Sequence, residues 1–142
     1  MVSAWKSFAE RITDILSKGI PTICQKQKPD NEPRLQEICD GLLQAGDVDL
    51  VREYPFMKWG SNLTKPDWSA EGLRLWVEAK YVRKKSDVAQ INEAIAADIT
   101  KYGDNNRRVL FVIYDPEHLI ADEASFRRPI EARPEMIVCF IR

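Results

Sequence analysis

Two short apolar segments, 109–114 (VLFVIY) and 136–141 (MIVCFI), constrain the fold more than any other part of the chain. The first is apolar on both faces, which is typical of a central strand that is covered on two sides. A strand pattern and a long helical pattern precede it. A strand, a helix and a second strand in succession favour a right-handed parallel crossover. We therefore predict an α/β fold in which strands are buried between helices.

Helical spacing of apolar residues predicts four helices, at residues 3–17, 33–45, 86–102 and 121–128. Gly19 and Pro21 should end the first helix, because proline lacks the N–H group that a helix interior uses. Pro33 suits the first turn of the second helix, and Gly46 should stop it. We expect residues 1–30 to form an N-terminal amphipathic helix and a connector, and residues 31–142 to form one domain.

Three further strands are predicted at residues 50–57, 64–69 and 73–81, with a loop at 59–64. The last two of these strands should form a hairpin. The order of elements in the domain is then αβββαβ. A three-strand meander joined to a parallel crossover gives a mixed central β-sheet flanked by helices.

Composition excludes several classes of protein. The 142 residues suit a single domain, and 44% hydrophobic with 30% charged residues is typical of a folded chain. The net charge of −1 gives no global attraction to nucleic acid, so an anionic partner needs a local basic patch. No apolar run is long enough to cross a membrane. Three separated cysteines favour a reducing, cytoplasmic compartment, and the single histidine excludes a site built on several histidines.

The strand at 73–81 carries two charges where an apolar strand normally has none. Glu78 and Lys80 point to the same face, about 7 Å apart. Burying an unpaired charge is very costly, so this pair needs a reason. One reason is an ordinary salt bridge on an exposed face, which contributes little stability. The alternative is that the two residues form part of an active site.

A third charge, Asp67, joins them only in one strand register. Asp67 must stand opposite Glu78, or be displaced from it by two residues, because a slip of one residue turns it to the other face. Ala79 turns its side chain away and leaves its carbonyl oxygen available. Two carboxylates and a carbonyl make a hard-oxygen site for Mg²⁺, with Mn²⁺ as a substitute. Glu32 can add a carboxylate there or hold a metal-bound water.

The chemistry of such a site is that of phosphodiester hydrolysis. The cation would lower the pKa of a bound water and neutralise charge on a phosphoryl oxygen. Lys80 can orient the attacking water, or stabilise the charge that develops on phosphorus. Arg83, Lys84 and Lys85 follow at once and either hold a phosphate backbone or form a solvated charge run.

These residues also carry a resemblance to a known family. Pro66-Asp67 followed by Glu78-Ala79-Lys80 at the end of an apolar strand resembles the PD-(D/E)XK nuclease superfamily, which has the restriction endonuclease-like fold. The resemblance implies that Asp67 and Glu78 bind metal, that Lys80 is the catalytic lysine, and that Glu32 is an accessory acid. It covers about residues 31–142, which would then be the nuclease-like domain.

A restriction-enzyme-like subgroup is similar over further landmarks. The first landmark is an acid in the first helix with a Leu-Gln pair, here Glu32 with Leu35-Gln36. The second is an acid followed by an apolar residue and then a tyrosine near the end of a helix, here Asp98-Ile99 with Tyr102. The third is a "YDP" turn, here Tyr114-Asp115-Pro116. The subgroup has a glycine-rich segment and an arginine before the aspartate, where this chain has residues 59–66. We interpret Asp98 and Tyr102 as a structural pair within their helix, and Asp115 as ordering its turn.

Our main hypothesis is a Mg²⁺-dependent endonuclease that acts on DNA, in restriction or anti-phage defence. One alternative is a non-catalytic nucleic-acid-binding or assembly module that retains the nuclease fold. A second alternative is a phosphoesterase that acts on RNA or a small nucleotide. Little chain lies outside the core, so we expect low sequence specificity, a homodimer, or assembly into a larger complex.

Overall fold

Residues 3–104 and 106–142 are described by the computed structural model of the protein. Its main sheet contains five strands in the spatial order β1-β4-β5-β6-β7. Their bounds are β1 Val51–Arg52, β4 Trp68–Ala70, β5 Leu75–Tyr81, β6 Arg108–Tyr114 and β7 Met136–Ile141. β1, β4 and β5 pair antiparallel, whereas β5, β6 and β7 pair parallel. The predicted mixed sheet is confirmed.

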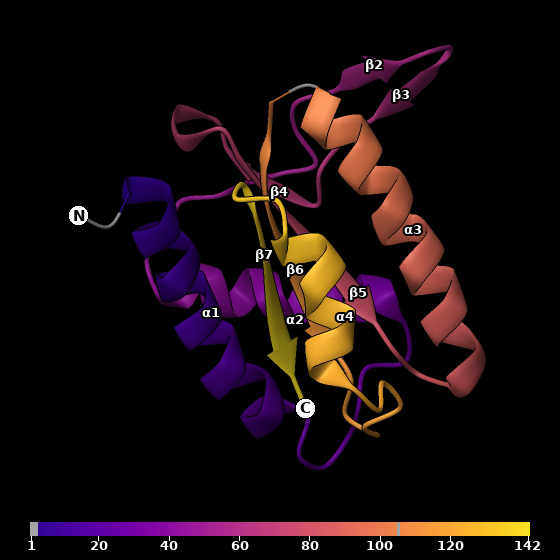
Figure 1. The fold of residues 1–142 in the computed structure, drawn as a ribbon. Coiled ribbons are helices and arrows are strands. Elements are labelled where there is room, and N and C mark those ends of the chain that lie inside the picture. The colour runs from indigo at the N-terminus through magenta and orange to yellow at the C-terminus, as the bar shows by residue number, and fades with distance from the viewer. Residues whose placement is uncertain (1–2, 105) are drawn as a thin grey trace.

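Helices cover both faces of this sheet (Figure 1). The four helices are α1 Ala4–Ile23, α2 Glu32–Ala45, α3 Lys85–Asp104 and α4 Glu123–Glu131. α1 and α2 pack on the face that carries Leu75, Val77 and Ala79. α3 and α4 pack on the opposite face, with Trp76 and Phe111. The structure therefore has three layers, and the α/β prediction with a helix-flanked sheet is confirmed.

The first helix is longer than predicted. α1 continues through Gly19 and Pro21 and ends at Ile23. Ile20 is fully buried, and a Cβ atom added to Gly19 would lie 2.5 Å from a methyl group of Leu42 in α2. Packing of α1 on α2 therefore outweighs the local preference of Gly19 and Pro21 to end the helix. Gly19 allows the side chain of Leu42 to approach closely and does not mark a helix end.

The predicted strand at 50–57 and the loop at 59–64 are also corrected. Pairing with β4 stops after Arg52, because Glu53 takes a left-handed conformation (φ 52°) and Pro55 has no N–H group to donate. The chain then forms a separate two-stranded hairpin from β2 (Met57–Trp59) and β3 (Asn62–Thr64). Gly60, at φ +60°, supplies the positive dihedral angle that a two-residue hairpin turn needs.

The second half of the chain follows the predicted order closely. α3, predicted at residues 86–102, begins one residue earlier and ends two residues later, at Asp104. After β6, the carboxylate of Asp115 accepts hydrogen bonds from the N–H groups of Leu119 (2.9 Å) and Ile120 (3.0 Å), so it orders the turn as expected. A short 3₁₀ turn, Glu71–Leu73, links β4 to β5. Among the described residues, no helix is long and apolar enough to cross a membrane.

Candidate active site

The pairing of β4 with β5 brings Asp67 to Glu78. Trp68 stands opposite Val77, so the next position along the antiparallel pair places Asp67 opposite Glu78. The Ala79 N–H donates a 2.8 Å hydrogen bond to Oδ2 of Asp67. The register predicted from the sequence is therefore the one observed. Since the N–H and C=O of one strand residue point to the same edge, the Ala79 carbonyl also faces the Asp67 side of β5.

Glu78 and Lys80 lie on the face of the sheet that α3 covers. The alternation along β5 turns Trp76, Glu78 and Lys80 to this side, because residues two apart in a strand share a face. Glu78 is only 5% exposed. Burial and then the negative charge of Asp67 raise the pKa of Glu78 well above its usual value. Burial likewise raises the pKa of Asp67, against the opposing effect of its hydrogen bond from Ala79.

Lys80 is a largely buried ammonium close to four acids. Its Nζ lies 3.6 Å from Oδ2 of Asp98, and the two side chains are 16% and 13% exposed. Burial acts to lower the pKa of Lys80, but the neighbouring carboxylates outweigh it, and the net shift is upward. Lys80 is therefore protonated at neutral pH. The acids responsible are Asp98, Glu78, Glu32 and Asp67.

Glu32 reaches the same cluster from the other layer of helices. The side chain of Asn31 caps α2 by accepting a 2.9 Å hydrogen bond from the Arg34 N–H, which places Glu32 in the first turn. Burial raises the pKa of Glu32, while the charge of Lys80 and a hydrogen bond with the Tyr81 backbone act to lower it. Asp67 and Glu32 thus meet the backbone of β5 at alternate residues, Ala79 and Tyr81. The structure brings all four predicted acidic and basic site residues together.

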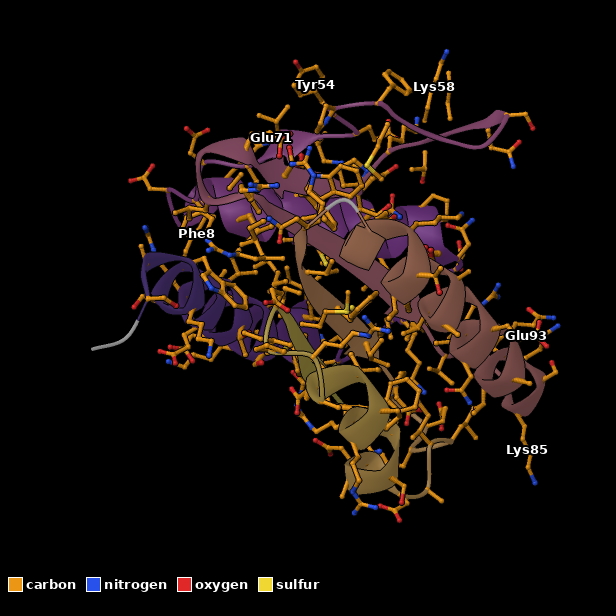
Figure 2. All side chains as sticks on the ribbon, turned by 45° about the horizontal axis from the view of Figure 1, so that its top comes forward. Phe8, Tyr54, Lys58, Glu71, Lys85 and Glu93 are labelled. Atoms are coloured by element: carbon orange, nitrogen blue, oxygen red, sulfur yellow. The ribbon has the colours of Figure 1, made fainter. Side chains whose placement is uncertain are left out.

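The basic run borders a cavity beside this cluster. The cavity has a volume of about 470 Å³ and is lined by Glu32, Tyr81, Arg83, Lys84, Asp87, Gln90 and Ile91. The carboxylate of Asp87 accepts hydrogen bonds from the backbone N–H groups of Arg83 (2.9 Å) and Lys84 (3.1 Å). The side chain of Lys85 does not line the cavity and projects from the end of α3 away from the molecule (Figure 2).

Two residues that contact the site were not assigned to it from the sequence. Asp98 pairs with Lys80, and the hydroxyl of Tyr102 donates a 2.9 Å hydrogen bond to Oε1 of Glu78. The interpretation of Asp98 and Tyr102 as a structural pair within α3 is corrected by these contacts. A signal was present, because Asp98 is a polar residue on the same helical stripe as the buried Ile91, Ile95 and Tyr102.

The donor set of the cluster suits a hard cation. Within residues 3–104 and 106–142, no three His, Cys, Asp or Glu side chains form a group that can hold a metal ion. The set expected from the sequence uses two carboxylates, of Asp67 and Glu78, and a backbone carbonyl, and Mg²⁺ accepts such a set because it keeps several waters. Four carboxylates act on the ammonium of Lys80, and a divalent cation bound here would stabilise their charged forms.

Comparison with known protein families assigns the chain. The model of the family described as REase_DpnII-MboI matches residues 5–141. No curated protein and no solved structure matches the chain. The match includes α1 as well as the sheet and the acidic cluster around Lys80, and it spans nearly all of the chain. The chain therefore belongs to the DpnII-MboI restriction endonuclease family.

Proposed function

We propose that the protein is a Mg²⁺-dependent endodeoxyribonuclease that hydrolyses phosphodiester bonds in restriction or anti-phage defence. Family membership supports a nuclease that acts on DNA. The observation that carries the rest is the position of Asp67 opposite Glu78, with Lys80 beside them on the face under α3. A purely structural pair on an exposed strand face would not bury these charges together.

Each residue has a definite part in this proposal. Asp67, Glu78 and the Ala79 carbonyl would hold the cation, which when bound would neutralise charge at the phosphate and lower the pKa of a water. Lys80, protonated and held beside these acids, orients that water or stabilises negative charge developing on the phosphate. Glu32 positions water from the cavity side. Arg83 and Lys84, which line the cavity, bind the phosphate backbone next to the reacting bond.

The central test is cleavage with and without a divalent cation. Purified protein should cut duplex DNA in Mg²⁺ or Mn²⁺, stop when a chelator is added, and resume when metal is restored. Gel analysis of duplex, single-stranded and branched DNA beside an RNA substrate measures both activity and preference. The variant Asp67→Ala serves as the control, because it lacks one proposed metal ligand and should cut none of them.

The other outcomes of this test identify the alternatives. Metal-independent DNA binding with no cleavage of any substrate would overturn the proposal and favour a non-catalytic nucleic-acid-binding or assembly module. Metal-dependent cleavage restricted to RNA or small nucleotides would favour a different phosphoesterase. Cleavage that continues in excess chelator would contradict the metal-dependent mechanism.

The basic run gives a second expected result. Arg83→Ala and Lys84→Ala should each weaken DNA binding, and each should reduce the slope of log Kd against log salt concentration by about 1, because each removes one phosphate contact. Lys85→Ala is the matched control, since its side chain projects away from the cavity (Figure 2). Salt titrations by fluorescence anisotropy measure the three slopes. An equal loss in all three variants would show a diffuse basic surface in place of two specific contacts.

A further inference from the structure

Two residues in the last two turns of α3 are spaced along the helix by nearly the same distance as Glu78 and Lys80 are along β5. Asp98 and Tyr102 are four residues apart on one side of the helix, a rise of about 6 Å. Lys80 and Glu78 are two residues apart on one face of the strand, about 7 Å. Asp98 forms an ion pair with Lys80, and Tyr102 donates a hydrogen bond to Glu78. The helix therefore contacts the strand at two successive positions on the same face.

We propose that Asp98 and Tyr102 are positioning residues of the nuclease site, with distinct effects on cleavage. Tyr102 fixes the carboxylate of Glu78 for metal binding, and Asp98 fixes the ammonium of Lys80 for the chemical step. Neither residue touches the substrate. This inference rests on the proposed function and adds to it the elements that hold its two central side chains in place.

Tyr102 is held on three sides. Its side chain is 2% exposed, and its ring packs edge-on against Trp76 with 4.8 Å between centroids. Its hydroxyl donates to Oε1 of Glu78 and also takes part in a hydrogen bond with the side chain of Thr64, at the end of β3. One oxygen of Glu78 is therefore committed to a rigid donor. The orientation of its other oxygen, toward Asp67 and the proposed cation, is set by this contact.

Asp98 holds Lys80 without removing its ability to donate. A lysine side chain is flexible, so an ammonium that must act at one point needs a fixed partner. The 3.6 Å separation from Asp98 is long for a strong hydrogen bond, and it leaves donor capacity on Nζ for a water or phosphate oxygen. The contact of the Asp98 carboxylate at the site is with the ammonium of Lys80, whereas Asp67 stands opposite Glu78 and accepts from the Ala79 N–H. We therefore assign it to Lys80 and not to the cation.

The experiment separates metal binding from turnover. Tyr102→Phe should weaken Mn²⁺ binding, measured by calorimetry without DNA, by about tenfold or more, and saturating Mn²⁺ should restore most of its cleavage rate. Asp98→Asn should bind Mn²⁺ like the wild type and keep its KM for DNA, but lose at least about tenfold in kcat. Asp98→Glu, which restores the carboxylate, should recover part of that loss.

Two matched variants on exposed positions serve as controls. Tyr54→Phe removes the hydroxyl of a tyrosine that is 56% exposed on the hairpin side, and Glu93→Gln removes an exposed carboxyl charge from α3 (Figure 2). Neither should change Mn²⁺ affinity or kcat. Thermal melting of every variant identifies losses that arise only from unfolding.

The outcomes are distinguishable from failure of the proposed function. Wild-type protein that neither binds Mn²⁺ nor cleaves DNA would overturn the proposed function itself. Active wild type with wild-type Mn²⁺ affinity in Tyr102→Phe and wild-type kcat in Asp98→Asn would overturn the positioning roles alone. The positioning roles would also be overturned if the activity losses of the variants simply followed their melting temperatures. In that case Tyr102→Phe and Asp98→Asn would not differ in which of Mn²⁺ affinity and kcat they lower, and Asp98→Glu would not recover activity.

Discussion

Lys80→Ala should lower the rate of DNA cleavage by a factor of about 10²–10⁴ while Mn²⁺ still binds. The range is that lost when a positioned proton-transfer or charge-stabilising group is removed. Four carboxylates act on Lys80, and two of them, the proposed metal ligands Asp67 and Glu78, remain in place without it. Single-turnover cleavage at saturating metal measures the loss, and calorimetry with Mn²⁺ measures the retained binding.

Removing the largely buried Lys80 also takes the ion-pair partner at 3.6 Å from Asp98, so Lys80→Ala needs a companion variant. Loss of one member of a buried ion pair costs about 3–5 kcal/mol of stability. Lys80→Arg keeps the positive charge beside Asp98 and should fold normally, yet its planar guanidinium cannot reproduce the position of Nζ. We expect it to be strongly impaired as well. Lys85→Ala, on the exposed end of α3, should cleave normally, and a fully active Lys80→Ala would contradict the mechanism.

The part of the site that lies on β5 was predictable because the direction of side chains alternates along a strand. Trp76, Glu78 and Lys80 share a face in the sequence pattern and in the structure, and the alternation also restricts where Asp67 can pair. A slip of one residue would turn Asp67 away from the face that carries Glu78 and Lys80. Local pattern and tertiary structure therefore agree at this point.

The contacts of α3 depended on information that a local pattern does not contain. Asp98 and Tyr102 are on the inward stripe of the helix, but which strand residues they meet depends on how α3 is rotated and shifted over β5. The hairpin was missed for a different reason. Strands of three residues, such as β2 and β3, are too short to show a clear alternation of apolar and polar residues. The main signal for this hairpin in the sequence is the turn residue Gly60.

The error at α1 shows packing overcoming local preference. Gly19 and Pro21 are both typical helix-ending residues, yet Ile20 between them is fully buried in the core formed with α2. The absence of a Cβ at Gly19 lets Leu42 approach closely. A glycine that permits contact between helices and a glycine that ends a helix look the same in a single sequence.

Glu78→Gln should make the metal-free protein more stable at neutral pH while abolishing cleavage. The pKa of Glu78 is raised in the folded state, mainly by burial and then by Asp67. In the unfolded chain a glutamate has its ordinary pKa of about 4.3. Between these two values the folded state binds more protons than the unfolded state, so wild-type stability falls as the pH rises through this interval. Glutamine has no charge to bury and avoids this loss.

The comparison should therefore depend on pH and on metal in a defined way. Below pH of about 4 the two proteins should melt alike, and the advantage of Glu78→Gln should grow as the pH rises through the raised pKa of Glu78. At neutral pH in chelator we expect a gain of about 3–6 °C in Tm, the size of a typical single stabilising change. Added Mg²⁺ should raise the Tm of the wild type and not of the variant, because a ligand stabilises only the protein that binds it.

Glu93→Gln makes the same change at an exposed position, and it should change neither the dependence of Tm on pH nor its dependence on Mg²⁺. A Glu78→Gln variant that is less stable than the wild type at neutral pH would contradict this prediction. It would show that the Glu78 side chain stabilises the fold, and that its burial does not lower the stability of the metal-free protein.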